Sequence, residues 1–404
     1  MLPPPRAVTC TFHHSRELDF DPQLARLMRL GPISRVRLPH GAGEAWLVTS
    51  FEGVRKVTTD PRFSRAAVAG RDYPRLTPEP IVSPESINVM DPPRSTRLRA
   101  LVAQAFTPQA VQTVRPAVQR ITDGLLDRMA DHGPPADLVR HLSDPLPHQL
   151  ICELLGVPPA DRERLRREAH RLLATGAGAG RAAAEAKAAL HAYFAGLVTE
   201  RHRTPGEDLI SALARARQDA DGADRLTDRE LAVMAATLLL SGLDTSTCQI
   251  SDIGYLFLSR PHLSALLRAH PEMLPAMVAE ALRYIPFRKG VGIPRVATED
   301  VELCGVVIRA GEYVHVSYLA ANRDPGRYVR PDVLDPYRPA RAHMTFGWGG
   351  HHCPAASLAT TELEIAVGSL FARFPELRLA APPDEVEWDE HTIRRFPLRL
   401  PVRW

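Results

Sequence analysis

A glycine-rich loop around one cysteine, Cys353, is the segment of this chain best suited to chemistry. Residues 346–359 read FGWGGHHCPAASLA, with three glycines before the cysteine and an apolar helical pattern after it. A thiolate held in such a loop, just before a helix, suits an axial ligand to haem iron. Backbone amides at the start of the helix can donate hydrogen bonds to the sulfur and moderate its charge.

Two other interpretations of the cysteine stay open from the residues alone. A lone cysteine is more often a small buried hydrophobe than a ligand. His351, His352 and Cys353 are also zinc-ligand types. However, three consecutive side chains converge poorly on one tetrahedral ion, and no second ligand pair follows at the usual zinc spacing. Zinc is therefore less favoured than haem.

A second segment of interest is a long predicted helix upstream of the cysteine. Thr227 and Glu230 form a capping-box pattern, which opens a helix over residues 228–259. This is far longer than the usual helix of about 11 residues. Residues 234–243 are nearly all apolar, so the middle of the helix is predicted to be buried.

Asp244 and Thr245 occur in the sequence SGLDTST, directly after this apolar stretch. A carboxylate and a hydroxyl inside a buried helix are costly unless they are paired or functional. The functional interpretation is proton chemistry at a buried site. The alternative is a polar kink in which Asp244 bonds to local backbone.

The loop around Cys353 resembles the haem-binding signature of the cytochrome P-450 family, F-G-x-G-x-H-x-C-x-G followed by L-A. The sequence departs from it at Ala355, where the family usually has glycine. The resemblance implies haem b, with its iron ligated axially by the Cys353 thiolate. It also places four further loop residues against the haem, namely Phe346, Gly347, Ala355 and Ala359.

Three further segments resemble the same family. Asp244 and Thr245 fall on the acid and the alcohol of its oxygen-activating motif, which implies that they deliver protons during catalysis. Glu280-x-x-Arg283, with Arg338 downstream, is similar to its structural Glu-x-x-Arg triad. The implied haem-propionate partners are Arg99, Arg295 and His351, while Ser95 stands where the family often has histidine.

The resemblance runs from about residue 31 to the C-terminus, and the nearest type is biflaviolin synthase, which couples aromatic metabolites. It rests on AWLVT at 45–49, Ile285-Pro286 before Arg288, and IRAG at 308–311. It implies oxidation of a small aromatic natural product with dioxygen, as C–C or C–N coupling of a phenol, indole or cyclic dipeptide. One alternative is regioselective hydroxylation of a polyketide or terpene. Another is a haem carrier or sensor, against which the Asp244-Thr245 pair argues.

Family position also predicts the residues that contact the substrate. They come from separate segments of the chain: Arg71, Val89, Leu240, Arg288, Val291, Ile293 and Ile393. Arg71 and Arg288 could hold a polar or anionic aromatic molecule by hydrogen bonding and stacking. The alternative for either arginine is an ordinary solvated side chain.

Composition limits the partners and the compartment. The chain has 404 residues, a formal net charge of +3 and scattered arginines, so no nucleic-acid partner is expected. Five cysteines without paired spacing favour reduced thiols and a cytoplasmic protein. The longest apolar run, residues 231–240, is too short to cross a bilayer, so no membrane contact is expected. The resemblance implies electrons from a ferredoxin and its reductase, with Arg97 a candidate docking residue.

The predicted fold is mainly α with small β-sheets, a single cytochrome P-450 domain over residues 1–404. It has a helix-rich lobe and a smaller β-rich lobe around haem. Periodicity predicts helices at 108–129, 160–173, 181–201, 228–259, 261–269 and 271–283. Strands are predicted at 33–38 and 45–49, as a hairpin, and at 301–303, 306–308 and 313–316. Residues 174–180 form a small-residue break, which the resemblance implies is a pocket lid.

Overall fold

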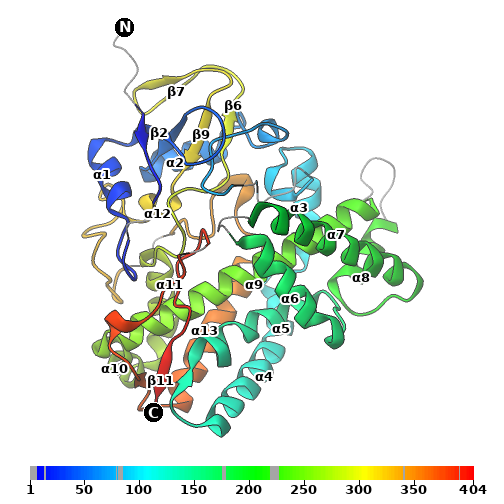
Figure 1. Cartoon of the computed structure of the whole chain (residues 1–404), viewed down its shortest axis with the longest axis vertical. Coiled ribbons are helices and arrows are strands. Elements are labelled where there is room, and N and C mark those ends of the chain that lie inside the picture. The colour runs from blue at the N-terminus through cyan, green and yellow to red at the C-terminus, as the bar shows by residue number, and fades with distance from the viewer. Residues whose placement is uncertain are drawn as a thin grey trace. The chain divides into compact units, whose positions relative to one another are not determined.

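The computed structural model describes residues 7–12, 15–78, 80, 85–174, 179–218, 227–339, 342–390 and 392–404 (Figure 1). The helices are α1 (Pro22–Leu30), α2 (Phe51–Thr59), α3 (Arg94–Gln104), α4 (Pro108–His132), α5 (Pro145–Leu154), α6 (Pro159–Leu173), α7 (Ala179–Arg203), α8 (Leu209–Gln218), α9 (Asp228–Leu258), α10 (Pro261–Ala269), α11 (Leu274–Tyr284), α12 (Tyr318–Ala321) and α13 (Ala356–Arg373). The strands are β1 (Val8–Thr9), β2 (Ile33–Arg37), β3 (Ala45–Val48), β4 (Phe63–Ser64), β5 (Ala136–Asp137), β6 (Arg295–Ala297), β7 (Val301–Leu303), β8 (Val306–Ile308), β9 (Tyr313–Val316), β10 (Arg378–Leu379) and β11 (Pro401–Arg403). The predicted fold class, mainly α with small sheets, is confirmed.

Local sequence signals account for most helix bounds. The capping box at Thr227 is present, with the Thr227 side chain accepting from the Glu230 N–H and the Glu230 side chain accepting from the Thr227 N–H. One predicted helix, 271–283, is instead a 3₁₀ turn (Pro271–Met273) followed by α11. Because Pro275 has no N–H, the α-helical bond back to the Pro271 carbonyl cannot form.

The chain divides into two compact units, and the first comprises Met1–Thr96 and Leu282–Cys353. It holds a six-stranded sheet with strand order β1-β2-β3-β9-β6-β4 and a separate pair, β7-β8. The predicted hairpin is confirmed, because β2 and β3 pair antiparallel with Ile33 opposite Val48. Strand β9 pairs parallel to β3 and antiparallel to β6, which places the Arg295 strand beside the centre of the sheet (Figure 1).

Helix α2 packs on this sheet through apolar side chains of both elements. Val54 and Val57 are fully buried, and they belong to one core cluster with Trp46 and Val314. The N-terminus of α2 is capped by Ser50, whose side chain accepts a hydrogen bond from the Gly53 N–H. The helix also contacts the 3₁₀ turn Gly349–His351, which lies within the cysteine loop.

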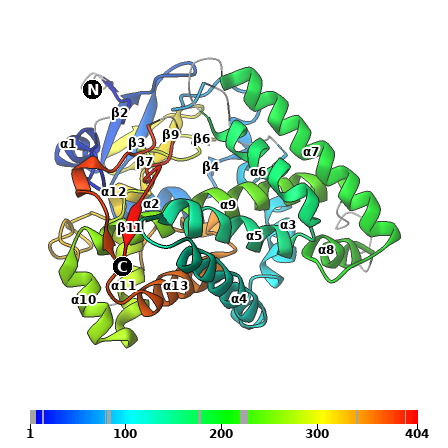
Figure 2. The same cartoon turned by 60° about the horizontal axis from the view of Figure 1, so that its bottom comes forward.

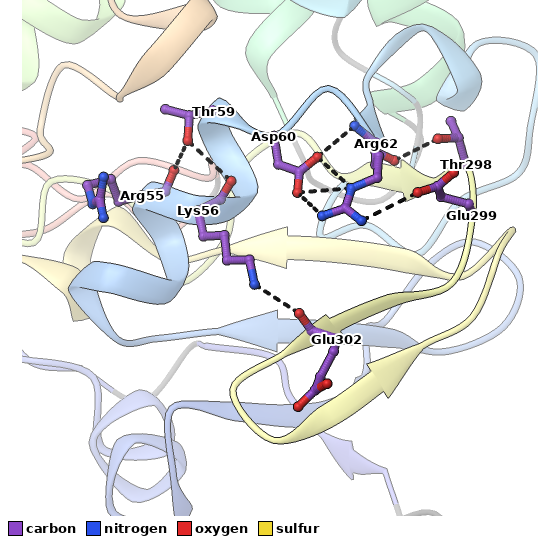
Figure 3. Close-up of polar contacts among 8 residues, drawn as sticks. All are labelled: Arg55, Lys56, Thr59, Asp60, Arg62, Thr298, Glu299 and Glu302. Atoms are coloured by element: carbon purple, nitrogen blue, oxygen red, sulfur yellow. Dashed lines mark hydrogen bonds and ion pairs between the residues drawn. The ribbon is translucent and has the colours of Figure 1, made fainter.

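The C-terminal end of α2 is tied to strand β7 and to the loop that precedes it (Figure 3). Lys56 Nζ donates to the Glu302 carbonyl oxygen at 3.0 Å. Asp60 and Arg62 form an ion pair at 2.6 Å, and Arg62 also reaches Glu299 at 3.4 Å. The hydrogen bonds from Arg62 hold the pKa of Asp60 below its usual value. These contacts fix α2, and α2 in turn supports the cysteine loop.

The second unit comprises Arg97–Ala281 and Pro354–Trp404, and α9 is its central helix. Helix α9 contacts α5, α7, α10 and α13, and α13 also packs against α4. Figure 2 shows α4, α5, α9 and α13 gathered together. Phe257 of α9 meets Phe371 of α13 with ring centroids 5.9 Å apart. A three-stranded sheet of order β10-β11-β5 completes the unit.

Helix α9 as a whole is long and apolar enough to cross a membrane, unlike the shorter apolar run considered from the sequence. In the structure, 67% of the most apolar 18-residue stretch of this helix is buried inside the protein. Burial by neighbouring helices explains the apolar composition, because a helix that is hydrophobic all round suits a protein core as well as a bilayer.

Two sequence predictions about organisation are left untested by the structure. The small-residue break contains Thr175 to Gly178, which lie outside the described residues. The single domain over residues 1–404 also stays a prediction.

Candidate active site

The loop around Cys353 is closed by its own backbone. The Cys353 N–H donates to the Phe346 carbonyl oxygen at 2.7 Å, and the Gly347 N–H donates to the Met344 carbonyl oxygen at 2.9 Å. Cys353 is half-buried and forms no disulfide bond within the described residues. Helix α13 begins three residues later, at Ala356. The sequence-predicted arrangement of a cysteine in a loop before a helix is therefore present.

Two glycines of this loop have conformations that other residues adopt with strain. Gly347 has φ +77° and Gly349 has φ +68°. A Cβ at Gly349 would lie 2.2 Å from the Thr58 carbonyl oxygen of α2. The loop thus rests directly on α2, and the glycine allows this close backbone approach.

A buried guanidinium group lies in the same unit. Arg295 is 1% exposed, and neither Nη1 nor Nη2 has a hydrogen-bond partner among the described residues. An uncompensated buried charge of this kind is costly, so it indicates a missing anion. A carboxylate matches the two parallel N–H groups of arginine.

Further positive charge gathers near Arg295, around the hydroxyl of Tyr318. Burial raises the pKa of the Tyr318 phenol, but the charges of Arg295, Arg65 and Arg288 outweigh it and hold the pKa below its ordinary value. A Cβ at Gly347 would lie 3.6 Å from the Tyr318 hydroxyl, so this cationic cluster adjoins the cysteine loop. Arg65 was missed by the sequence reasoning, since its segment DPRFSR carries no chemical pattern.

The cysteine loop and the arginine cluster together fit haem. The sulfur can serve as an axial ligand, and the buried Arg295 fork can hold a propionate. Within the part of the chain that the structure describes, no group of three or more His, Cys, Asp or Glu side chains is placed to hold a metal ion. The donor set therefore fits a thiolate-ligated haem better than a zinc site.

The other predicted propionate partners lie on helices or turns. Arg99 is half-buried on α3, and His351 is half-buried in the turn Gly349–His351. Ser95 is 3% exposed, and its N–H donates to the Asp91 carbonyl oxygen at 3.0 Å. The roles of Arg99 and His351 toward haem stay predictions.

The predicted acid and alcohol both lie on α9, in the second unit. Thr245 Oγ1 donates to the Ser241 carbonyl oxygen, one turn earlier, at 2.6 Å. Asp244 is buried and accepts a hydrogen bond from Nε of Arg394, with which it forms an ion pair. The alternative of a bond from Asp244 to local backbone is not what the structure shows, because its hydrogen-bond partner is a distant side chain.

A second buried carboxyl group bonds to another residue of α9 and was missed by the sequence reasoning. Ser246 Oγ donates to Oε2 of Glu362 at 2.7 Å, while Glu362 Oε1 has no hydrogen-bond partner among the described residues. Burial raises the pKa of Glu362 to about 7, with the Ser246 hydrogen bond lowering it in part. Glu362 can therefore hold or release a proton near neutral pH. The only sequence signal was an acid within the apolar pattern of residues 361–367.

The predicted structural triad is seen in part. Arg283 Nη1 donates to the carbonyl oxygens of Asn322 and Pro331, each at 2.8 Å. Arg283 and Arg338 both donate to the Val333 carbonyl oxygen, at 3.2 and 2.9 Å. They fix the segment that leads into the cysteine loop. The contact of Glu280 with them stays a prediction.

The predicted substrate contacts occupy different environments. Arg71 is exposed, which matches an ordinary solvated side chain, and Arg288 lies with the cationic cluster around Tyr318. The remaining candidates are buried or half-buried apolar residues, namely Val89, Leu240, Val291, Ile293 and Ile393. In addition, the predicted docking residue Arg97 forms an ion pair with Glu230 at 3.2 Å, with which docking would compete.

Comparisons with known proteins agree with this geometry. Residues 172–393 match the family model for cytochrome P450. The chain is 47% identical over 388 residues to nocardicin C N-oxygenase of Nocardia uniformis subsp. tsuyamanensis, covering 96% of each chain. It is 42% identical to biflaviolin synthase CYP158A1 of Streptomyces coelicolor over 96% of this chain and 93% of the relative. The solved structure of cytochrome P450mel 107F1, described as having biaryl coupling reactivity, superposes with a TM-score of 0.96 at 56% identity, covering 99% of this chain and 100% of that one.

Proposed function

The chain belongs to the cytochrome P450 family, and from that premise we propose that it couples small aromatic natural products oxidatively. It is a monooxygenase-type enzyme that uses haem with a cysteine-ligated iron and takes electrons from a redox partner. The proposal concerns what it oxidises and how the product is formed.

The observation that carries the proposal is the likeness over the full chain to a P450 with biaryl coupling reactivity, at 56% identity. Biflaviolin synthase, at 42% identity, supports it from the sequence side. We expect phenols, indoles or indole-bearing cyclic dipeptides as substrates, in the secondary metabolism of a bacterium.

We assign Cys353 as the residue that would ligate the haem iron. Arg295 holds one propionate through its buried fork, and Arg99 and His351 complete the propionate contacts. Phe346, Gly347, Ala355 and Ala359 line the haem face of the loop. When bound, the haem supplies the activation of dioxygen, with thiolate donation from Cys353 favouring O–O cleavage.

The balanced reaction distinguishes coupling from monooxygenation. In coupling, two aromatic molecules each lose one hydrogen atom and a C–C or C–N bond forms between them. Dioxygen, two electrons and two protons are consumed, and two water molecules leave. In monooxygenation one oxygen atom enters a single substrate and one water molecule leaves. Both reactions need protons at a buried site.

The residues of α9 and its neighbours supply those protons. The Thr245 hydroxyl, which can release its hydrogen bond to Ser241, passes a proton toward the reacting oxygen. Asp244 orients that transfer from the preceding position. Glu362, with a pKa of about 7, can hold an exchangeable proton at Oε1, because Oε2 accepts the hydrogen bond from Ser246. A group that titrates near the working pH is effective in such a relay.

The substrate is held by the apolar side chains predicted from family position, namely Val89, Leu240, Val291, Ile293 and Ile393. Arg71 and Arg288 are the candidate polar contacts. For Arg288, its place beside Tyr318 favours a role with the haem propionates over a role with substrate.

A second candidate function is favoured by a different relative. The likeness to nocardicin C N-oxygenase, at 47% identity, supports transfer of oxygen to a single small molecule. Hydroxylation of a polyketide or terpene belongs to the same reaction class. These monooxygenations give a monomeric product, whereas coupling gives a dimer.

The electron donor that we propose is a small acidic ferredoxin with its reductase, and the enzyme acts in the cytoplasm. A net charge of +3 favours an acidic partner over a basic one. Because Arg97 is engaged with Glu230, other basic residues carry the docking.

Reaction under ¹⁸O-labelled dioxygen with mass analysis decides between the two functions. The reconstituted enzyme is given a panel of phenols, indoles and indole-bearing cyclic dipeptides, after binding-induced spectral shifts have identified those that enter the site. Coupling predicts a dimeric product with both monomers minus two hydrogen atoms and no label. A labelled monomeric product would refute coupling and leave monooxygenation standing.

A further inference from the structure

The acid of the oxygen-activating pair has a partner from a distant part of the chain. Oδ2 of Asp244 accepts a hydrogen bond from Nε of Arg394, 150 residues later. Each side chain of this ion pair is 11% exposed. The charge of Asp244 raises the pKa of the Arg394 guanidinium, against the burial that lowers it.

The segment that carries Arg394 is itself held in place. The Arg394 N–H donates to Thr392 Oγ1 at 3.0 Å, and Thr392 Oγ1 donates to Oδ2 of Asp389. The Asp389 N–H donates to the Phe396 carbonyl oxygen at 2.9 Å, which ties Asp389 to Phe396 across the loop that carries Arg394. The backbone at Arg394 is therefore fixed independently of its side chain.

The same loop is anchored to α9 at a second point. The ring of Trp388 meets the ring of Tyr255 edge-on, with centroids 5.0 Å apart. Tyr255 lies about three helical turns beyond Asp244. Two attachments to one helix, at Tyr255 and at Asp244, define where the Arg394 guanidinium lies along α9.

Other ionisable groups near the pair do not replace Arg394 as the counter-charge. Burial raises the pKa of the Cys248 thiol well above its usual value, so this group is neutral. Burial also raises the pKa of Asp252, and the charge of Arg395 lowers it only in part. Asp389 adds a further acid to the surroundings. Arg394 is thus the cation that both hydrogen-bonds and pairs with the buried Asp244.

We propose that Arg394 is the positioning residue of Asp244, and that it pairs with this carboxylate and fixes it on α9 for proton transfer. The inference rests on the proposed role of Asp244 in the proton relay. A guanidinium group stays charged throughout the working pH range, and its planar fork fixes the carboxylate as well as neutralising it. Arg394 touches neither substrate nor haem in this role and acts through Asp244.

The test compares Arg394→Met with Arg394→Lys in the reconstituted holoenzyme. The measured quantity is the coupling efficiency, which is the ratio of product formed to NADH consumed, across a pH series. Hydrogen peroxide is measured as well, because it reports the electrons that do not reach product. Loss of the cation favours protonation of the buried carboxyl, so the pH midpoint of coupling in Arg394→Met should rise by about 1–3 units. Arg394→Lys keeps the charge and should restore most of the wild-type profile.

A matched control is Arg201→Met. Arg201 pairs with Asp208 at 2.7 Å in the same unit, with side chains 13% and 8% exposed. Its loss should lower stability without moving the pH midpoint of coupling. The comparison separates general damage to the fold from the loss of the positive charge beside Asp244.

A second readout does not depend on turnover. Infrared difference spectra of Arg394→Met should contain a band of a protonated buried carboxyl that wild type lacks. The Arg394→Met/Asp244→Asn double variant should lose this band. No new band and no shift of the midpoint in Arg394→Met would overturn the inference.

The outcomes also distinguish this inference from the proposed relay. If Asp244→Asn uncouples the enzyme while Arg394→Met behaves as wild type, the relay stands and the role of Arg394 is wrong. If Asp244→Asn remains fully coupled, the relay is wrong, and with it the dependence on Arg394. Equal loss of stability in the Met and Lys variants, with unchanged pH profiles, would make Arg394 a structural residue only.

Discussion

Replacement of Arg295 by methionine should release haem without unfolding the protein. Arg295 lies on β6 with its backbone in the sheet and its side chain 1% exposed. Neither terminal nitrogen of Arg295 has a hydrogen-bond partner among the described residues, and the partner that we propose is a haem propionate. Methionine has a similar length and no charge, so it should fill the same space without leaving a buried cation behind.

The size of the effect follows from breaking a buried charge pair. Removal of one partner costs about 3–5 kcal/mol, because the other charge stays buried without compensation. Each 1.4 kcal/mol is a factor of ten in an equilibrium constant. Haem affinity should therefore fall by roughly two to three and a half orders of magnitude. Arg295→Lys should show a smaller loss, because it keeps the charge but not the fork.

The assay is the rate of haem transfer from the holoenzyme to an excess of apomyoglobin under native conditions. The control is Arg323→Met, in the same unit. Arg323 is 4% exposed, but its guanidinium donates to the Tyr284 carbonyl oxygen at 2.7 Å and pairs with Asp332 at 2.9 Å. Its loss should lower the free energy of unfolding and leave haem transfer near the wild-type rate. A wild-type transfer rate in Arg295→Met, or equal acceleration in both variants, would refute the reasoning.

Three shorter predictions follow from the same structure. Cys353→Ala should abolish the red-shifted Soret band of the reduced, carbon monoxide-bound protein, and persistence of that band would mean that another residue ligates the iron. Because burial raises the pKa of Glu362 to about 7, the folded protein binds more protons than the unfolded chain between about pH 4.3 and 7, so stability falls as pH rises through this window. Glu362→Gln should remove this fall, worth roughly 3 kcal/mol, in urea titrations at several pH values, and an unchanged slope would contradict the assignment. Reduction by an acidic ferredoxin should slow as salt increases, since screening weakens electrostatic docking, and salt-independent rates in stopped-flow measurements would exclude this partner.

Local sequence patterns predicted the elements of the fold better than its tertiary contacts. The capping box at Thr227 and the strand of Tyr313–Val316 were read correctly, because caps and alternation depend on neighbouring residues. The short helix α2 was missed although it carries a local signal, the Ser50 cap, and strand β6 was missed because three residues are too few to show an alternating pattern. The predicted helix 271–283 was wrong at its start for a local reason, the missing N–H of Pro275.

The candidate site shows the same division. Cys353, Asp244 and Thr245 could be predicted because a family signature surrounds them. Arg394 and Glu362 could not, because their partners lie 150 and 116 residues away in the sequence. A buried contact between distant residues produces no periodic pattern in the sequence, and a single arginine or glutamate is more often solvated.

The placement of functional groups in the two units makes their roles separable by experiment. The first unit carries Cys353 and the Arg295 cluster, which we propose bind the cofactor. The second carries the pairs Asp244–Arg394 and Ser246–Glu362, to which we assign proton transfer. Substitutions in the first set should therefore change haem retention and spectra, whereas those in the second should change coupling and pH dependence while haem stays bound. The ionisable groups of each set bond to neighbours within that set. The changes in the free energy of unfolding caused by one substitution from each set should therefore add, as expected for sites without shared partners.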